Sequence, residues 1–136
     1  MKLEINNKQT ITFKNDSDGD WFGEINLNNK NFEFSFYNKQ FIDWEDIKRR
    51  IIYFINHHKE IIEISEKGII EYQKFLGWNL NYDFGLDCIE LPINKERKDY
   101  FIIPYRYNDE TGFDYVLWEI YIYDENGPKL REVKRE

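Results

Sequence analysis

The stretch DWEDIKRRIIYFINHHKEIIEISEKGIIEYQKFLG, residues 43–77, decides the fold, because it has a helical pattern and both of its flanks have strand patterns. Asp43 is a suitable helix N-cap, with Asp46 three residues later, and Gly77 is a suitable C-cap. Between them apolar residues and one histidine recur at spacings of three and four, which predicts amphipathic helix. They are Ile47, Ile51, Phe54, Ile55, His58, Ile61, Ile62, Ile69, Ile70, Tyr72, Phe75 and Leu76.

One continuous helix over this length would be unusually long for a single domain, so we expect a break. The candidate positions for the break are Asn56-His57-His58 and the segment Ser65–Gly68. The stretch therefore predicts two helices, whose shared apolar stripe covers one face of a sheet.

The residues before this stretch have the pattern of an antiparallel meander of four strands. Apolar and polar residues alternate around Leu3, around Ile11, along Trp21–Leu27 and along Phe32–Phe36, which predicts strands with one buried face. Asn28-Asn29 predicts a tight hairpin, because asparagine tolerates the left-handed backbone of such turns.

The residues after the stretch predict three or four further strands. Pro104 places its strand at an edge or a bulge, since proline cannot donate to a strand ladder. Asn126-Gly127 predicts a hairpin turn. The strands are Phe84–Ile93, Tyr100–Tyr107, Phe113–Tyr123 and a short closing strand, Lys129–Val133.

The predicted fold class is α+β, in a single domain over residues 1–136. We expect an antiparallel sheet of about seven strands, in the order four strands, two helices, then three or four strands. Both helices are expected to pack on one face. Aromatic residues make up 18% of the chain, which is ample core material and argues against intrinsic disorder.

The net charge indicates which class of partner the protein binds, and the cysteine content indicates its redox compartment. The formal net charge is −7, which argues against nucleic acid and favours a basic protein partner. The basic runs Lys48–Arg50 and Lys129–Arg135 are interpreted as solvated surface.

The single Cys88 allows no intramolecular disulfide, which suits a reducing cytosol. No stretch resembles a signal peptide or a membrane span, so we expect a cytoplasmic protein with no membrane partner.

No pattern in the sequence predicts a metal site or a cofactor site. Asp16, Asp18 and Asp20 resemble a calcium loop, but Trp21 stands where an EF-hand needs glycine and Leu27 where it needs glutamate, so we interpret them as a polar turn. Adjacent residues on a helix point about 100° apart, so the neighbouring histidines 57 and 58 suit one metal ion poorly, and we expect His58 to pack in the core.

No pattern predicts an active site either. Cys88 is interpreted as a small strand hydrophobe, because nothing local provides a base for it. No serine stands in a GxSxG motif and no glycine-rich phosphate loop is present. We therefore predict a protein that is not an enzyme, with no catalytic residue.

Tyrosines suggest a binding surface instead. Six tyrosines, Tyr100 to Tyr123, fall on neighbouring predicted strands. Those on the face away from the helices would form an aromatic surface flanked by acidic residues, a usual composition of protein interfaces. Ordinary strand filling is the alternative. The predicted partner-binding residues are Tyr105, Tyr107, Asp109, Glu110, Asp114 and Tyr115.

A family resemblance covers most of the chain in order. Its residues are Trp21-Phe22-Gly23-Glu24-Ile25, Phe84-Gly85-Leu86, Asp114-Tyr115, Trp118-Glu119-Ile120-Tyr121 and Arg131-Glu132. With the helical segment between them, these resemble small bacterial domains of unknown function encoded beside polymorphic-toxin and contact-dependent-inhibition genes. The resemblance implies an immunity protein: an acidic, cytosolic protein that binds a toxin domain and blocks it. It implies no catalytic residue.

Two alternatives remain at this point. The first is a small interaction or regulatory module that forms a homodimer through an edge strand near Pro104. The second is a metal-independent hydrolase, which would need a concave pocket holding a carboxylate or histidine with a perturbed pKa. Residue patterns leave open whether the protein is a monomer or a homodimer.

Overall fold

The computed structural model describes residues 1–6, 9–38, 41–77, 84–86, 88–93, 99–108 and 114–135, and for Phe84, Tyr107, Asn108 and residues 114–117 the backbone alone. These residues contain one α-helix and ten strands. The elements in chain order are β1 (Lys2–Asn6), β2 (Gln9–Thr12), β3 (Lys14–Asn15), β4 (Asp20–Leu27), β5 (Lys30–Tyr37), α1 (Trp44–Phe75), β6 (Phe84–Leu86), β7 (Ile89–Glu90), β8 (Asp99–Asn108), β9 (Asp114–Asp124) and β10 (Pro128–Arg135).

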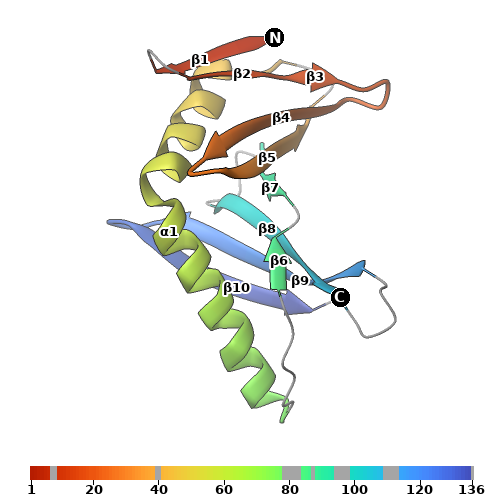
Figure 1. Ribbon diagram of the computed structural model, residues 1–136, viewed down its shortest axis with the longest axis vertical. Coiled ribbons are helices and arrows are strands. Elements are labelled where there is room, and N and C mark those ends of the chain that lie inside the picture. Colours follow the sequence, from red (N-terminus) through yellow and green to blue (C-terminus); the bar gives the residue numbers. More distant parts are fainter. Residues whose placement is uncertain are drawn as a thin grey trace.

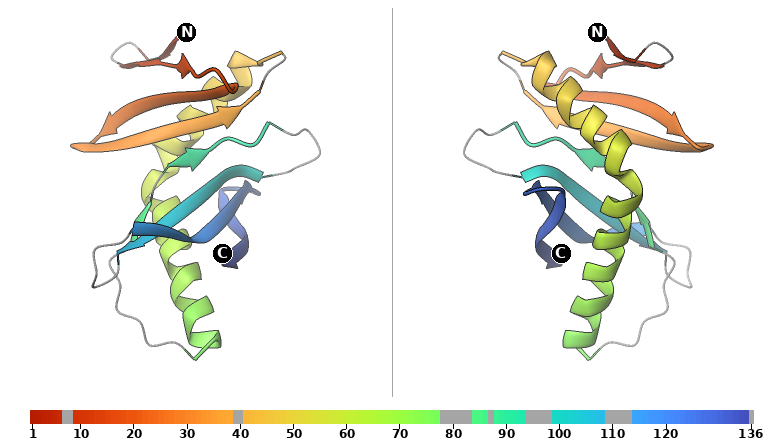
Figure 2. Two further views of the ribbon diagram at one scale, coloured as in Figure 1. Left: turned by 90° about the vertical axis from the view of Figure 1, so that its right-hand side faces the viewer. Right: turned by 90° about the vertical axis from the view of Figure 1, so that its left-hand side faces the viewer.

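The strands form one large sheet and one small hairpin. The large sheet has the order β10-β9-β8-β7-β5-β4-β3, with β6 beside β8, and β1 pairs with β2. The helix lies along one face and crosses the strands from one end of the sheet to the other (Figure 1). The two side views show strands in front of the helix from one side and the helix in front of the strands from the other (Figure 2).

The predicted fold class was wrong in its architecture. We expected two helices on an antiparallel sheet of about seven strands, whereas the described chain has one helix, and strands take up nearly half of the chain. The large sheet is also mixed, because β5 and β7 pair in parallel, with Phe34 opposite Ile89. The crossover through α1 explains this pairing, since a chain that returns through a helix re-enters the sheet in the same direction.

The predicted break is absent at both candidate positions, since α1 is continuous through Asn56-His57-His58 and through Ser65–Gly68. At the second position the residues that suggested a break serve packing. Ser65 stays helical and its hydroxyl donates to the Ile61 carbonyl at 2.7 Å, one turn earlier. Gly68 is the point where α1 comes closest to β10: a Cβ there would lie 2.9 Å from Leu130 Cδ2 and 3.2 Å from Val133 Cγ2. A glycine that looks like a helix breaker thus allows the helix to continue over the sheet edge.

Several local predictions are confirmed. The Asp43 carboxylate accepts the backbone N–H of Asp46 at 3.2 Å, as an N-cap should. Asn28 and Asn29 have positive φ angles of 52° and 66°, and Asn126 one of 56°, as their hairpin turns require. These features depend on a few adjacent residues and were therefore readable from the sequence.

Phe54 joins the two halves of the sheet. Its ring lies 5.3 Å from that of Phe32 and 5.4 Å from that of Phe34, both in β5. It also lies 5.7 Å from the ring of Phe101 in β8. All four side chains are buried, and each contributes about 1.5–3 kcal/mol on burial. The helix thereby holds β5 and β8 together across the two-residue strand β7.

We predict that Gly68→Val lowers the free energy of unfolding by about 1–3 kcal/mol, because the added side chain overpacks against β10. Lys67→Val is the control, since it puts the same side chain on the adjacent exposed position and should cost less than about 1 kcal/mol. Denaturant unfolding measures both. A Gly68→Val protein as stable as the wild type would contradict the close approach, because valine is the better helix former.

Candidate interaction surface

Two β-bulges lie at one corner of the large sheet. Tyr100 is the extra residue where Asp99 pairs with Tyr123 and Phe101 with Ile122. Arg131 is the extra residue in β10, between the pairs made by Leu130 and Glu132. A bulge re-aims a side chain that simple alternation would point elsewhere. The corner where β8 begins and β9 ends therefore has side chains in unusual directions.

The bulge at Tyr100 brings it against α1. The Arg49 guanidinium lies 5.2 Å from the Tyr100 ring centroid and donates to its hydroxyl at 2.6 Å. The Tyr100 ring also meets that of Tyr53 edge-on, with centroids 5.1 Å apart. His57 lies against the other side of this group, with its ring 4.4 Å from that of Tyr53.

Tyr53 connects α1 to the hairpin between β9 and β10. Its hydroxyl donates to Asp124 Oδ1 at 2.8 Å, and burial followed by this hydrogen bond raises the pKa of Tyr53. The same oxygen accepts the backbone N–H of Gly127 at 3.0 Å. We call Arg49, Tyr53, His57, Tyr100 and Asp124 the corner cluster.

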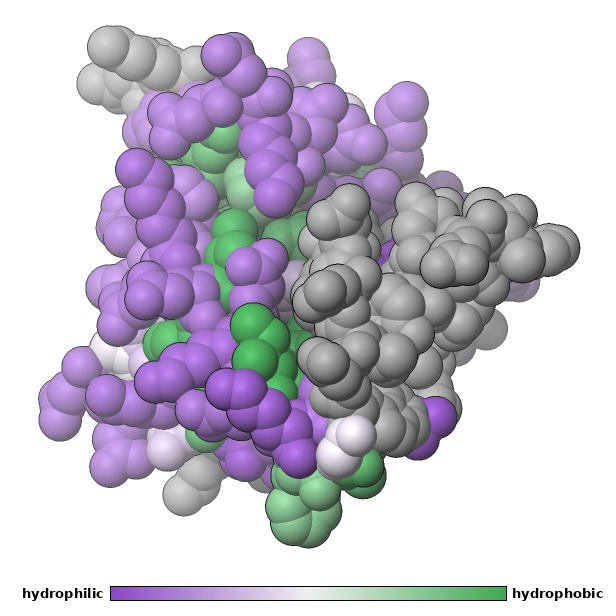
Figure 3. All heavy atoms as spheres, turned by 60° about the horizontal axis from the view of Figure 1, so that its bottom comes forward, coloured by the Kyte–Doolittle hydropathy of each residue, from purple (hydrophilic) through white to green (hydrophobic). Residues whose placement is uncertain are grey.

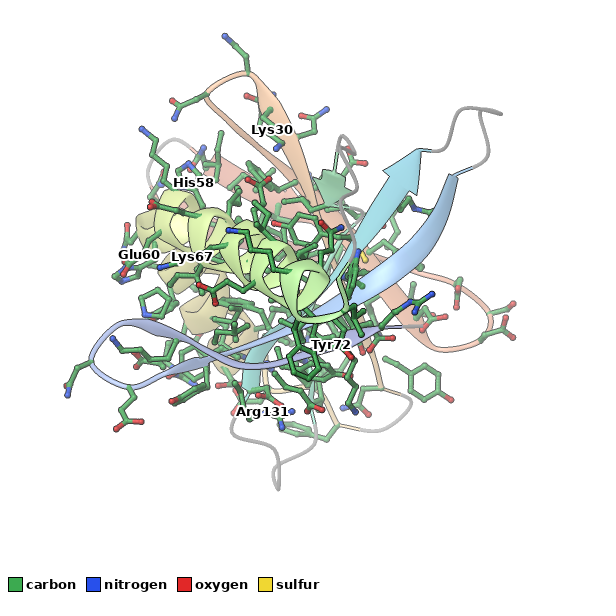
Figure 4. All side chains as sticks on the ribbon, turned by 90° about the horizontal axis from the view of Figure 1, so that it is seen from below. Lys30, His58, Glu60, Lys67, Tyr72 and Arg131 are labelled. Atoms are coloured by element: carbon green, nitrogen blue, oxygen red, sulfur yellow. The ribbon has the colours of Figure 1, made fainter. Side chains whose placement is uncertain are left out.

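Figure 4 shows the molecule from below, with Glu60 on the flank of α1 toward the β9–β10 hairpin. Its carboxylate lies 3.7 Å from His57 Nδ1 at the rim of the corner cluster. The cluster thus combines three aromatic rings with charged groups of both signs on a helix and a strand pair.

Arg50, the residue after Arg49 in α1, holds the backbone at this corner through its buried side chain. Its side chain is only 5% exposed and its guanidinium lies 3.1 Å from Asp46. It donates to the backbone carbonyls of Pro92 at 2.8 Å and Tyr100 at 3.3 Å. Burial lowers the pKa of Arg50. Three acceptors held by one buried guanidinium fix the backbone at the bulge, so Tyr100 is a preorganised side chain.

The opposite face of the same strands has a second charged group. Arg131 forms a bidentate pair with the buried carboxylate of Asp99, at 2.7 and 2.9 Å, and this hydrogen bonding raises the pKa of Arg131. The guanidinium also lies 4.9 Å from the Tyr121 ring. Arg131 is seen on the side of the strands away from α1 in Figure 4. Here the pairing ties β8 to β10 across β9.

None of the predicted partner-binding residues belongs to the corner cluster. Tyr105 is 1% exposed in the core, because the alternation of β8 points it toward α1, so it is not part of a surface. Of Tyr107, Asp114 and Tyr115 only the backbone is described; the register sets Tyr107 opposite Tyr115. Asp109 and Glu110 lie outside the described residues. The corner cluster is at the opposite end of β8 and β9 from the backbone of Tyr107, Asp114 and Tyr115.

Sequence reasoning missed most of the corner cluster, although part of a signal was present. Arg49, Tyr53 and His57 are spaced by four residues and therefore lie on one flank of α1, beside the apolar stripe. Tyr100 was recognised among the strand tyrosines, but its bulge has no sequence signature. The contact with Asp124 depends on the tertiary fold alone.

The residues weighed as metal ligands have structural contacts instead. Asp16 Oδ1 accepts the backbone N–H groups of Asp18 at 2.9 Å and Asp20 at 3.0 Å, which closes the turn. His58 packs edge-on against Phe32, with centroids 5.9 Å apart. Within the described ranges, no group of three or more His, Cys, Asp or Glu side chains is placed to hold a metal ion.

One hollow lies away from the corner cluster, beside the β3–β4 turn. Its volume is about 360 Å³. Its lining combines asparagine, aspartate and serine with two apolar residues, and the buried indole nitrogen of Trp21 has no hydrogen-bond partner among the described residues. The lining residues are Asn15, Asp16, Ser17, Gly19, Trp21, Asn38 and Ile42.

Figure 3 views the molecule obliquely from below; most of the coloured residues there are hydrophilic, and apolar ones show in a band among them and at the lower edge. In the part of the chain that the structure describes, no helix has the length and apolar character needed to cross a membrane.

Comparison with protein-family models, with curated proteins and with solved structures finds no significant match to this chain.

Replacing Arg50 and Arg49 one at a time should distinguish the stabilising role of a buried arginine from the small contribution of an exposed one. We predict that Arg50→Met lowers the free energy of unfolding by about 2–3 kcal/mol, because two buried carbonyls lose a charged donor. Arg49→Met, at a side chain that is 57% exposed, should cost less than about 1 kcal/mol. Urea unfolding of both variants measures the difference. Equal losses would contradict the anchoring role of Arg50.

The buried Tyr105 hydroxyl lies near Ser65, whose own hydroxyl donates to the Ile61 carbonyl, and among the described residues it makes no hydrogen bond of good geometry. Burial, followed by the nearby Glu66 carboxylate, raises the pKa of this tyrosine, and Ser65 offsets part of that rise. We predict that Tyr105→Phe leaves the free energy of unfolding unchanged or raises it, because it removes an unpaired polar group. The matched control is Tyr53→Phe, which loses the bond to Asp124 and should cost about 0.5–1.5 kcal/mol. Denaturant unfolding at neutral pH measures both variants. A larger loss of unfolding free energy for Tyr105→Phe than for Tyr53→Phe would contradict the view that the Tyr105 hydroxyl makes no stabilising hydrogen bond.

Proposed function

We propose that this protein is a non-enzymatic binding protein, most specifically a bacterial immunity protein that neutralises a cognate toxin domain in the cytoplasm by direct binding. The corner cluster carries the proposal. Its tyrosine and arginine side chains are of the types that dominate binding energy at protein interfaces. They are already fixed by hydrogen bonds and by the Arg50 anchor, so little side-chain entropy is lost on binding.

Two further observations support a toxin as the partner. The net charge of −7 favours rapid encounter with a basic protein, because opposite potentials steer association. The resemblance of the strand aromatics to immunity-type domains supplies the biological context. Asp109, Glu110 and Asp114 stay predicted as additional contacts.

The strand near Pro104, through which self-association was expected, is not an edge strand of the sheet. Strand β8, which contains Pro104, pairs with β9 on one side and with β6 and β7 on the other. The large sheet instead ends at β10, where Lys129, Arg131 and Lys134 are exposed and a bulge interrupts the ladder. Charges and bulges on an edge strand oppose pairing with another sheet. We therefore favour a heterologous partner.

The test is co-expression with the C-terminal domain of the product of the adjacent upstream gene, read by growth and by pull-down. We predict that wild-type protein restores growth and forms a stable complex. The double variant Tyr53→Ala/Tyr100→Ala should weaken binding at least about 100-fold, since truncating such anchors costs about 2–4 kcal/mol.

Phe75→Ala is the control, because Phe75 is 85% exposed at the far end of α1 and its loss should leave rescue intact. Failure of the wild-type protein to bind or rescue would exclude this toxin as the partner and with it the immunity function. Rescue by the double variant at wild-type affinity would place the interface elsewhere.

A further inference from the structure

We propose that the corner cluster recognises one arginine side chain of the partner, held against Tyr53 and His57 between the carboxylates of Glu60 and Asp124. This inference rests on the proposed function and deepens it by naming the chemistry that the surface selects. It is carried by a cation already bound within the cluster and by a neighbouring position that has aromatic rings and carboxylates but, among the described residues, no lysine or arginine paired with them.

The cation already present belongs to Arg49. Its guanidinium lies over the Tyr100 ring at 5.2 Å, donates to the Tyr100 hydroxyl and forms an ion pair with Asp46. An aromatic face with a carboxylate beside it is the usual environment of an arginine in a protein. Half of the cluster is thus a filled arginine site built from the chain's own residues.

The other half has equivalent groups. The Tyr53 and His57 rings lie 4.4 Å apart at an interplanar angle of 36°. Each ring has a carboxylate beside it: the Tyr53 hydroxyl donates to Asp124, and Glu60 lies 3.7 Å from His57. No lysine or arginine of the described chain forms an ion pair with either carboxylate, whereas Asp46 has two arginine partners.

The hydrogen bonding of Asp124 leaves it ready to accept a donor. Both of its hydrogen bonds, from the Tyr53 hydroxyl and the Gly127 backbone, go to Oδ1. The second oxygen is therefore available while the carboxylate is held in place. The side chains of His57 and Glu60 are 36% and 57% exposed, so a ligand can reach the site from solvent.

The chemistry selects a guanidinium among possible ligands. Two carboxylates disfavour an anion. These groups are not among any set of three or more arranged to hold a metal ion in the described chain. A planar guanidinium can stack on an aromatic ring while donating to carboxylates on both sides, which an ammonium does less well.

The test uses a short probe rather than the unidentified partner. The peptide acetyl-Gly-Arg-Gly-amide is titrated into the protein and the ring signals of Tyr53 and His57 are followed by NMR. We expect saturable shifts with a dissociation constant in the millimolar range, as for a single side chain at an exposed site. The matching citrulline peptide has the same shape without the charge and should bind at least about tenfold more weakly.

Two double variants test whether the arginine side chain binds at Glu60 and Asp124. Glu60→Gln/Asp124→Asn should weaken arginine binding at least about tenfold, whereas Asp18→Asn/Glu24→Gln removes the same charge elsewhere and should not. Equal binding of the citrulline peptide, or unchanged binding by the first variant, would overturn the inference. Growth rescue without arginine binding would keep the proposed function and remove this inference. Arginine binding without rescue would keep the site and remove the toxin.

Discussion

The structure depends on one helix that spans two half-sheets with little other connection. Strands β3–β5 and strands β8–β10 are joined within the sheet by β7, which has only two residues. Phe54 packs against β5 and β8 at once, and further along α1 the ring of Tyr72 meets that of Trp118 in β9, with centroids 5.2 Å apart. A helix of 32 residues, about 48 Å long, is what this arrangement needs. Two shorter helices would leave one half-sheet uncovered or the junction unsupported.

The same helix sets the position of the corner cluster. Its core face is occupied by the two half-sheets, so the flank carrying Arg49, Tyr53 and His57 faces the start of β8 and the β9–β10 hairpin. Arg50, on the next position, reaches inward to the carbonyls of Pro92 and Tyr100. The side chains proposed to bind a partner are therefore held by the same contacts that hold the fold together, which gives a rigid surface.

Local features of the fold could be predicted from the sequence, and features set by tertiary contact could not. The Asp43 cap and the asparagine turns depend on neighbouring residues and were found. The helix break was expected near Asn56-His57-His58 or within Ser65–Gly68. At Gly68 the lack of a side chain suggests a weak point in the helix until β10 is placed against it. The bulge at Tyr100 and the inward direction of Tyr105 depend on strand register. For that reason the sequence prediction did not include the corner cluster, and of the residues that it named only Tyr105 is placed in the core.

The most direct measurement of the central claim is hydroxyl-radical footprinting of the protein alone and in complex with the proposed toxin domain, read residue by residue by mass spectrometry. Aromatic side chains that a partner covers lose reactivity, and uncovered ones keep it. A partner at the corner predicts protection of Tyr53, His57 and Tyr100, whereas Phe41 and Phe75, which are strongly exposed and are not part of the cluster, should still be oxidised. Protection at Phe41 or Phe75 with the corner cluster unchanged would contradict the account.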